Sequence, residues 1–407
     1  MRILQVNKFN YIRGGAEKYF IEISKNLEEL GHQVAIFSMH HPKNNPSPWE
    51  KYFVSRLSFN EAKLRDRLIT PGRILYSLEA KRKFKSLVKD FKPDIIHIHN
   101  IYHQISPSIL DVAKKYQIPV VMHLHDYKLI CPNYQLFVDD QICYRCRGKK
   151  YLNCIKHRCF KKSLLKSLLA TLEMYLHHKV LRIYKKNIDY FIAPSQFMKD
   201  TVVSFSWDEN KIEVIYNFSE KMIEHSSEKI EDYGLFFGRL SREKGVDILL
   251  RALSLSKKHN TLKIVGQGPE EDNLRQLVSD LKLDQRVEFL GYRSGEELHN
   301  IIRKARLIYL PSVWNENMPL TLLESLELGK VVVASKTGGL PELIESGQNG
   351  FLFEKANFKE LAQIIDDSFN YDLVEMGKKA KERVKDLKVE NHMVKLLDLY
   401  NRVLKRY

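Results

Sequence analysis

Short apolar runs alternate with amphipathic helical stretches along most of the chain. The runs are rich in β-branched residues, and the alternation starts again in the second half. This pattern predicts an α/β protein with two parallel sheets and crossover helices. The predicted strands are 2–6, 33–37, 95–99, 120–124 and 190–193 in the first half, and 233–237, 261–265, 287–290, 307–310 and 331–334 in the second.

A polar, charged stretch at 219–232 separates the two series of strands and predicts an interdomain linker. We therefore expect one domain at 1–218 and a second at 219–388. Amphipathic patterns also predict one long helix over 164–186 and a last helix within 389–407.

A strand end, a loop and a helix start follow one another around residue 316. Asn317 is the expected N-cap of this helix, and Pro319 fits its first turn. A helix N-terminus favours an anion such as a phosphate, yet Glu316 and Glu324 flank it. Two carboxylates suit the place if they accept hydrogen bonds from hydroxyl groups of one ligand, which a nucleotide sugar offers on both sides of its pyrophosphate. Taken alone, the two glutamates are equally well explained as solvated surface residues.

Polar and glycine residues also follow two strands of the first half. Gly14 and Gly15 lie between the first strand and the first helix, where they would let the backbone approach a phosphate. His125 follows the strand 120–124, at the edge where doubly wound sheets bind ligands. Singly, these residues fit a tight turn and a structural histidine just as well.

Three motifs taken together resemble a known family. They are the E-x7-E pair Glu316 and Glu324, the Gly-Arg-Leu and Lys-Gly segment within 235–245, and the Gly-Gly-Leu-Pro-Glu turn at 338–342. In this order and spacing they are similar to the family-4 retaining glycosyltransferases, and the resemblance covers nearly the whole chain. It implies two Rossmann-like domains facing across a cleft (the GT-B architecture), an N-terminal acceptor domain, a C-terminal nucleotide-sugar domain, and a last helix that crosses back.

The resemblance also implies roles for individual residues. A hexosyl group would pass with retention from a UDP- or GDP-sugar to an acceptor, without a catalytic metal. Arg239 and Lys244 would neutralise the departing pyrophosphate, Glu316 would accept from the donor sugar, and Glu324 would accept from the ribose. His125 would lie beside the reacting sugar. The remaining donor-binding residues would be Gly14, Gly15, Gly266, Gly268, Asn317, Met318, Pro319 and Leu320.

All five cysteines fall within an insertion at about 131–160. Four of them have the spacing C-x2-C-x7-C-x4-C, and disulfides are not expected in a cytoplasmic protein. The spacing predicts one structural zinc ion, with Cys131 left as a buried thiol; a cluster of free thiols is the alternative. The predicted ligands are Cys143, Cys146, Cys154 and Cys159.

A net charge of +16 predicts attraction to polyanions. The run 145–166 contains many basic residues and no acidic one, which is typical of a binding face. The basic, amphipathic stretch 55–92 fits either a membrane surface or a helix pair that covers the sheet. Because the sequence shows neither an apolar run of about 18 residues nor a signal-peptide core, we expect a cytoplasmic protein, peripherally associated with the anionic inner membrane face.

The expected acceptor is a lipid-linked saccharide used in cell-surface polysaccharide assembly. The alternatives are a soluble saccharide acceptor, an inverting enzyme and a non-catalytic protein that binds sugar nucleotides. Nucleic acid is not an expected partner, because the basic residues are not interleaved with stacking aromatic residues. A nicotinamide-dependent oxidoreductase is disfavoured because no G-x-G-x-x-G follows the first strand.

Overall fold

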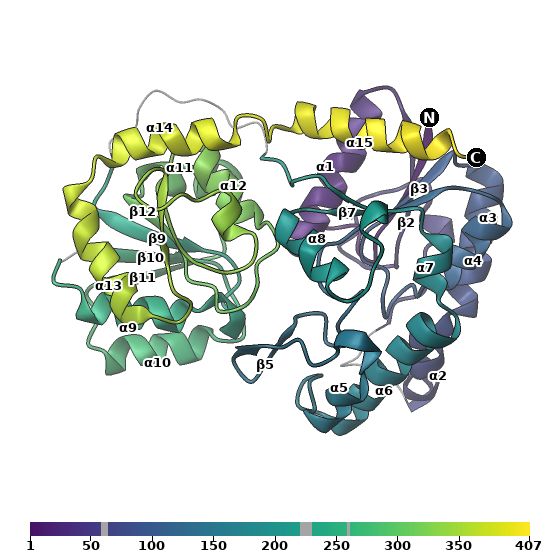
Figure 1. Cartoon of the computed structure of the whole chain (residues 1–407), viewed down its shortest axis with the longest axis horizontal. Helices are drawn as coiled ribbons and strands as arrows, with labels where there is room; N and C mark the ends of the chain where they lie inside the picture. Colours follow the sequence, from purple (N-terminus) through teal and green to yellow (C-terminus); the bar gives the residue numbers. More distant parts are fainter. Residues whose placement is uncertain (58–63, 220–229, 259–260) are drawn as a thin grey trace. The chain divides into compact units, whose positions relative to one another are not determined.

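The chain divides into two compact units. A computed structural model describes residues 1–57, 64–219, 230–258 and 261–407. The first unit comprises 1–138, 143–215 and 393–407, and the second comprises 139–142 and 216–392. Most of the linker predicted at 219–232 lies outside the described residues. Both termini belong to the first unit (Figure 1).

The first unit contains a six-stranded parallel sheet with the order β2-β1-β3-β4-β7-β8. The central strands are buried along their whole length, as expected for a parallel sheet covered on both faces. Because the strand order reverses between β1 and β3, their carboxyl ends form a topological switch point. The strands are β1 (Arg2–Val6), β2 (Gln33–Phe37), β3 (Ile95–Ile98), β4 (Val120–His123), β7 (Tyr190–Ala193) and β8 (Ile212–Val214).

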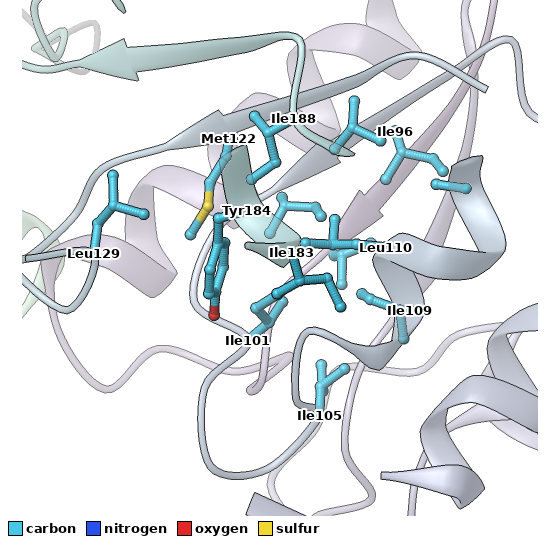
Figure 2. Close-up of a cluster of buried hydrophobic side chains, with 14 of the residues drawn as sticks. Ile96, Ile101, Ile105, Ile109, Leu110, Met122, Leu129, Ile183, Tyr184 and Ile188 are labelled. Atoms are coloured by element: carbon cyan, nitrogen blue, oxygen red, sulfur yellow. The ribbon is translucent and has the colours of Figure 1, made fainter. Parts of the chain in front are cut away.

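Several helices of the first unit contribute buried apolar side chains to the core around this sheet. Figure 2 shows part of that core, where Ile96 and Met122 of the strands lie near Leu110 and Ile183 of two helices. The helices are α1 (Gly15–Glu29), α2 (Leu64–Tyr76), α3 (Leu78–Phe91), α4 (Ser108–Lys115), α6 (Leu164–Tyr175), α7 (Ile183–Asn187) and α8 (Gln196–Val203).

Within the stretch 55–92, residues 64–91 form the two helices α2 and α3. Helix α3 buries Phe84, Leu87 and Phe91 in the core. Two of its charged side chains, Lys83 and Glu79, form an ion pair with each other at 3.8 Å. Of the two interpretations of this stretch, the structure favours a covering for the sheet. Arg65 and Arg67 also belong to this basic stretch, and their side chains lie outside the described part.

The prediction of one long helix over 164–186 is wrong. Helix α6 ends at Tyr175, a π-helical turn spans Leu176–Val180, and α7 begins at Ile183. Between them Arg182 has a left-handed backbone with φ of 51°. The apolar stripe continues across this break, so the hydrophobic pattern alone could not reveal it. The preceding insertion contains a small hairpin, β5 (Phe137–Val138) and β6 (Gln141–Ile142), and a short helix, α5 (Leu152–Lys156).

The second unit contains a six-stranded parallel sheet with the order β11-β10-β9-β12-β13-β14. This is the Rossmann order 3-2-1-4-5-6, whose switch point lies between β9 and β12. The edge strand β14 was not among the predicted strands. The strands are β9 (Tyr233–Phe237), β10 (Thr261–Val265), β11 (Val287–Gly291), β12 (Leu307–Leu310), β13 (Val332–Ser335) and β14 (Gly350–Phe353).

Two hydrophobic clusters cover the faces of this second sheet. The helices that supply them are α9 (Val246–Leu255), α10 (Glu271–Asp280), α11 (Gly295–Lys304), α12 (Leu320–Glu327), α13 (Phe358–Asp367) and α14 (Leu373–Val384). Together the two units confirm the predicted pair of Rossmann-like domains.

The last helix, α15 (Val389–Leu404), crosses back to the first unit as predicted. The hydroxyl of Tyr400 lies 2.7 Å from Nδ1 of His97 in β3. Arg402 donates to Glu213 of β8 at 2.6 Å. Within the residues that the structure describes, no helix combines the length and the apolar character that crossing a membrane requires.

Candidate functional site

Most of the predicted site residues of the second unit lie in loops at one edge of its sheet. Because all six strands are parallel, the loops that follow β9, β10 and β12 leave the sheet at the same edge. Arg239 and Lys244 follow β9, Gly266 and Gly268 follow β10, and Glu316, Asn317, Met318 and Pro319 precede α12, which begins at Leu320 and carries Glu324.

A buried ion pair joins two of these loops. The Nζ of Lys244 donates to Oε1 of Glu316 at 2.7 Å, and the hydroxyl of Ser312 donates to the same oxygen at 2.6 Å. Burial opposes ionisation of Glu316, but the Lys244 ammonium and the Ser312 hydroxyl outweigh it, so the pKa of Glu316 is lowered. From the sequence, Lys244 was expected at a pyrophosphate. Its ion pair with Glu316 and the hydrogen bond from Ser312 to Glu316 were not predicted.

Gly245 holds Lys244 against the loop of Glu316. Its φ is 65°, and a Cβ there would lie 2.1 Å from the carbonyl oxygen of Pro311. A larger residue would therefore push the two loops apart. The backbone N–H of Val313 also donates to the carbonyl of Glu243 at 2.9 Å. The Lys-Gly pair of the motif thus has a direct structural purpose.

The Gly-Gly-Leu-Pro-Glu turn fixes the backbone of Glu316 from the other side. Gly339 donates its N–H to the carbonyl of Glu316 at 2.8 Å. Gly338 has φ of 58°, and a Cβ there would lie 1.8 Å from that same carbonyl oxygen. The second and third motifs therefore both serve to place one carboxylate.

Gly266 and Gly268 are required by the packing of their own loop. A Cβ on Gly266 would lie 1.9 Å from the carbonyl of Gly238, and one on Gly268 would lie 2.0 Å from the carbonyl of Leu240. Leu240 also donates to the carbonyl of Gln267 at 3.0 Å. This contact explains both glycines without a ligand, and their part in donor binding stays a prediction.

The start of α12 differs from the prediction. Pro319, with ψ of 137°, is the N-cap, and the helix begins at Leu320, so the prediction that Asn317 caps it is wrong. Met318 is buried, and its carbonyl accepts from the side chain of Asn217 at 2.8 Å. Since proline offers no side-chain acceptor, the first N–H groups of α12 are left for water or an anion. Glu324 is only 7% exposed, so it is not a solvated surface glutamate.

In the first unit, Gly14 and Gly15 lie at the start of α1. Both are exposed. The backbone of Gly14 is extended, and the nearest atom that a Cβ there would meet is Oε2 of Glu17, at 3.9 Å. Unlike Gly266 and Gly268, Gly14 is therefore not required by local packing. This open backbone suits the predicted approach of a phosphate.

His125 lies at the carboxyl end of β4 in a stack of imidazole rings. Its Nε2 is 2.9 Å from Nδ1 of His99, whose Nε2 is 2.8 Å from Oε1 of Gln5. Burial, with the nearby Lys8 ammonium, lowers the pKa of His125 to about 3. The ring is therefore uncharged near neutral pH and can orient a sugar without attracting the phosphates. His99 and Gln5 were not predicted; the only signal was their place near the carboxyl ends of β3 and β1.

A buried network of charges lies beside His125. Burial lowers the pKa of Lys8 and raises that of Asp126, to which the hydroxyl of Tyr102 donates. Lys128 pairs with Glu173 of α6 at 2.7 Å, with both side chains almost completely buried. This pair ties the loop after β4 to α6.

The cysteine insertion contains free thiols, not disulfides. A hydrogen bond from the Cys159 thiol lowers the pKa of Cys154. Burial raises the pKa of Cys131 to about 12, in keeping with the expected buried thiol. Over the described ranges, which include every cysteine, no group of three or more His, Cys, Asp or Glu side chains is arranged to hold a metal ion. The four cysteines thus do not form a ready-made site, and zinc binding stays a prediction.

Two family models together match almost the whole chain. The model of Glycosyltransferase Family 4 matches residues 13–219, which is more than half of the chain, and the model of Glycosyl transferases group 1 matches residues 217–386. An uncharacterized 42.6 kDa protein in the cps region of Klebsiella pneumoniae is 28% identical over 398 residues, covering 92% of this chain and 97% of that protein.

Two further relatives show the range of the family. A colanic acid biosynthesis glycosyltransferase of Escherichia coli, WcaL, whose assignment is itself provisional, is 30% identical over 157 residues, or 36% of this chain and 39% of that protein. The crystal structure of Anabaena HepE in complex with UDP has a TM-score of 0.69 at 20% identity, covering 99% of this chain and 100% of HepE, which establishes a common GT-B fold. The chain therefore belongs to glycosyltransferase family 4 and is a glycosyltransferase.

Proposed function

We propose that this glycosyltransferase moves a sugar, with retention, from a uridine or guanosine diphosphate sugar to a lipid-linked saccharide in cell-surface polysaccharide assembly. The observation that carries the proposal is the buried pair of Lys244 and Glu316, beside the open N-terminus of α12. A cation, a carboxylate and free N–H groups at one sheet edge suit the diphosphate and hydroxyl groups of one ligand.

In this proposal Lys244 has two partners during the reaction. Its Nζ, bonded to Glu316, has further N–H groups that can reach a phosphate oxygen as negative charge develops there. Arg239, whose side chain is exposed on the same loop, supplies a second cation. No metal ion is then needed for the leaving group. Retention would follow from attack on the same face from which the phosphate leaves, with the phosphate taking the acceptor proton.

Glu316 and Glu324 have different environments, which supports different roles. Glu316 accepts hydrogen bonds from Lys244 and Ser312 at Oε1, and in this proposal its Oε2 would accept from a donor-sugar hydroxyl. Glu324 lies one turn inside α12, where it would accept from the ribose. His125 of the first unit, uncharged near neutral pH, would line the sugar.

The relatives support the acceptor class. The Klebsiella protein comes from a cps region and the Escherichia coli enzyme is assigned to colanic acid biosynthesis, and UDP in the HepE crystals favours a uridine nucleotide. The lipid-linked acceptor of this proposal would call for an enzyme that reaches a membrane surface.

An apolar face of α6 supports peripheral membrane association. Leu165, Leu168 and Leu172 are 75%, 49% and 51% exposed and share one face of the helix, because their spacing is three and four residues. Lys162 and Lys166 beside them are also exposed. A helix whose exposed leucines share one face and are flanked by lysines suits an anionic bilayer, because the leucines can enter the apolar layer while the lysines contact the headgroups. We therefore assign the proposed membrane contact to α6 and the adjoining basic run 145–166, and not to the stretch 55–92.

The test is a panel of uridine, guanosine and adenosine diphosphate sugars, each assayed for thermal stabilisation and for slow donor hydrolysis, with and without EDTA. We expect one uridine or guanosine diphosphate sugar to raise the melting temperature and to be hydrolysed equally well in EDTA. NMR of the product then gives the anomeric outcome. Absence of stabilisation and hydrolysis across the whole panel would contradict the proposed donor class.

A further inference from the structure

A hollow in the first unit is lined by none of the predicted site residues. It is a small hollow of about 30 Å³ that opens to solvent. Its lining comes from the loop after β4, the insertion, the turn between α6 and α7, and the segment after α8. The lining residues are Ile130, Lys149, Tyr151, His178, Arg182, Lys185, Phe205, Ser206 and Trp207.

Aromatic rings form the walls of this hollow. Tyr151 and His178 are almost completely buried. The His178 ring stacks on Tyr184 with centroids 5.3 Å apart and meets the edge of Trp207 at 5.9 Å. Burial lowers the pKa of His178 to about 3. The walls are therefore fixed by packing and carry no charge near neutral pH.

The charges of the hollow are all positive. The Nζ of Lys149 lies 3.4 Å from the carbonyl of His178. Burial and the nearby cations Lys185, Arg182 and Lys179 lower the pKa of Lys149. Among the described residues, none of these four cations forms an ion pair, and the lining contains no carboxylate. Cations that crowd one another without a counter-charge create a strong local attraction for an anion.

Two of the cations are held by unusual backbone conformations. Lys149 has φ of 62° and Arg182 has φ of 51°, both in the left-handed region that residues other than glycine seldom adopt. Such conformations cost free energy and tend to persist where a side chain must be kept in one place. Here they set the backbone directions from which Lys149 and Arg182 extend at the rim.

We propose that this hollow binds the phosphate group of a phosphate ester. Lys149, Arg182 and Lys185 would bind the phosphate oxygens, and the faces of Tyr151 and Trp207 would contact the carbon skeleton next to the phosphate. The phosphate could come from a lipid headgroup or from a soluble ester. The site itself does not depend on the proposed function; only a lipid source rests on the proposed membrane association.

A lipid source has one structural argument in its favour. The hydroxyl of Thr171 in α6 donates to the carbonyl of Tyr151 at 3.2 Å, and the ring of Tyr151 meets that of Tyr175 at 5.5 Å. The wall of the hollow is thus attached to the helix that carries the exposed leucines. A membrane contact through α6 would bring phospholipid headgroups near the rim.

The test compares the full-length protein with two double variants of equal charge. Arg182→Gln/Lys185→Gln removes two rim cations, and Lys114→Gln/Lys115→Gln removes two exposed cations from the last turn of α4. One arm measures the rise in melting temperature with inorganic phosphate against chloride at constant ionic strength. The other measures sedimentation with vesicles of phosphatidylglycerol, phosphatidic acid or phosphatidylcholine.

We expect the rim variant to lose most of the phosphate-dependent rise, and its binding to anionic vesicles to fall at least about tenfold more than that of the α4 variant. Loss in the phosphate arm alone supports a soluble ester, and loss in the vesicle arm alone supports a lipid headgroup. Rim and α4 variants that behave alike in both arms overturn the proposal. Thermal stabilisation by UDP, measured on the same samples, tests the donor site separately, so its absence would leave the phosphate site standing.

Discussion

Replacing Lys244 by methionine separates the catalytic purpose of the Lys244–Glu316 pair from its structural one. Lys244→Met keeps most of the side-chain length but removes the ammonium that lies 2.7 Å from Glu316. The carboxylate, whose side chain is 7% exposed, then keeps Ser312 as a donor but has lost its counter-charge.

The structure gives a magnitude for both effects. Removing one partner of a buried ion pair costs about 3–5 kcal/mol, and because the Lys244 side chain is 24% exposed we expect the lower end. At about 2–4 °C per kcal/mol for a domain of this size, the melting temperature of the second unit should fall by roughly 6–12 °C. Loss of one transition-state contact should lower kcat/KM at least about a hundredfold, which corresponds to about 2.7 kcal/mol.

The pH dependence of stability gives an independent check. The pKa of Glu316 is lowered in the native protein, so the pair contributes stability above the ordinary value of 4.5 and loses it as the pH falls through the native pKa. Without Lys244, burial is no longer outweighed, and the pKa of Glu316 should rise above 4.5. The variant should therefore lose stability relative to wild type most at pH 7, and the difference should shrink as the pH approaches 4.

Two controls make the assay decisive. Lys244→Met/Glu316→Gln has no unpaired charge, so its melting temperature should recover while its activity stays low. Lys336→Met breaks an exposed pair with Glu354 at 3.4 Å in the same unit and should cost at most about 1 kcal/mol, with normal activity. If Lys244→Met and Glu316→Gln both keep near wild-type kcat/KM with native melting curves, the site assignment is wrong.

Three other variants test the remaining assignments. Glu324→Gln should weaken binding of the nucleotide sugar by about tenfold or more with little change in kcat, because it loses charge-assisted hydrogen bonds that are made in the ground state. Titration calorimetry measures this affinity, and a fall in kcat alone would argue against a ribose contact. Elemental analysis should give one zinc per chain, lost in Cys146→Ser, whereas metal-free protein with five titratable thiols would favour plain packing. Leu165→Gln/Leu168→Gln should lower binding to phosphatidylglycerol vesicles at least about tenfold. The control variant Leu30→Gln, which replaces a 54% exposed leucine at the C-terminal end of α1, should bind like wild type. Equal vesicle binding by the two variants would remove α6 from the membrane contact.

Ten of the twelve strands in the two six-stranded sheets were determined by the sequence alone. Each predicted strand coincides with an observed one to within one residue, because buried parallel strands appear as short apolar runs whatever surrounds them. The edge strands β8 and β14 and the hairpin β5–β6 were missed; β5, β6 and β8 have only two or three residues, which is too few to carry a pattern. The break after α6 was missed for the opposite reason, because an apolar stripe continues across it.

The order of motifs along the chain likewise determined the family, but the tertiary structure alone decided what each motif does. Residues 72 positions apart in the sequence, Lys244 and Glu316, meet only because β9 and β12 are neighbours at a switch point. Gly266 and Gly338 also follow strands, and at both positions the backbone of another loop lies so close that a Cβ atom would not fit. The exposed leucines of α6 and the unpaired cations around Arg182 have no motif at all. Whether a side chain is covered, paired or left open depends on which distant segments pack against it, and that is decided by the folded chain.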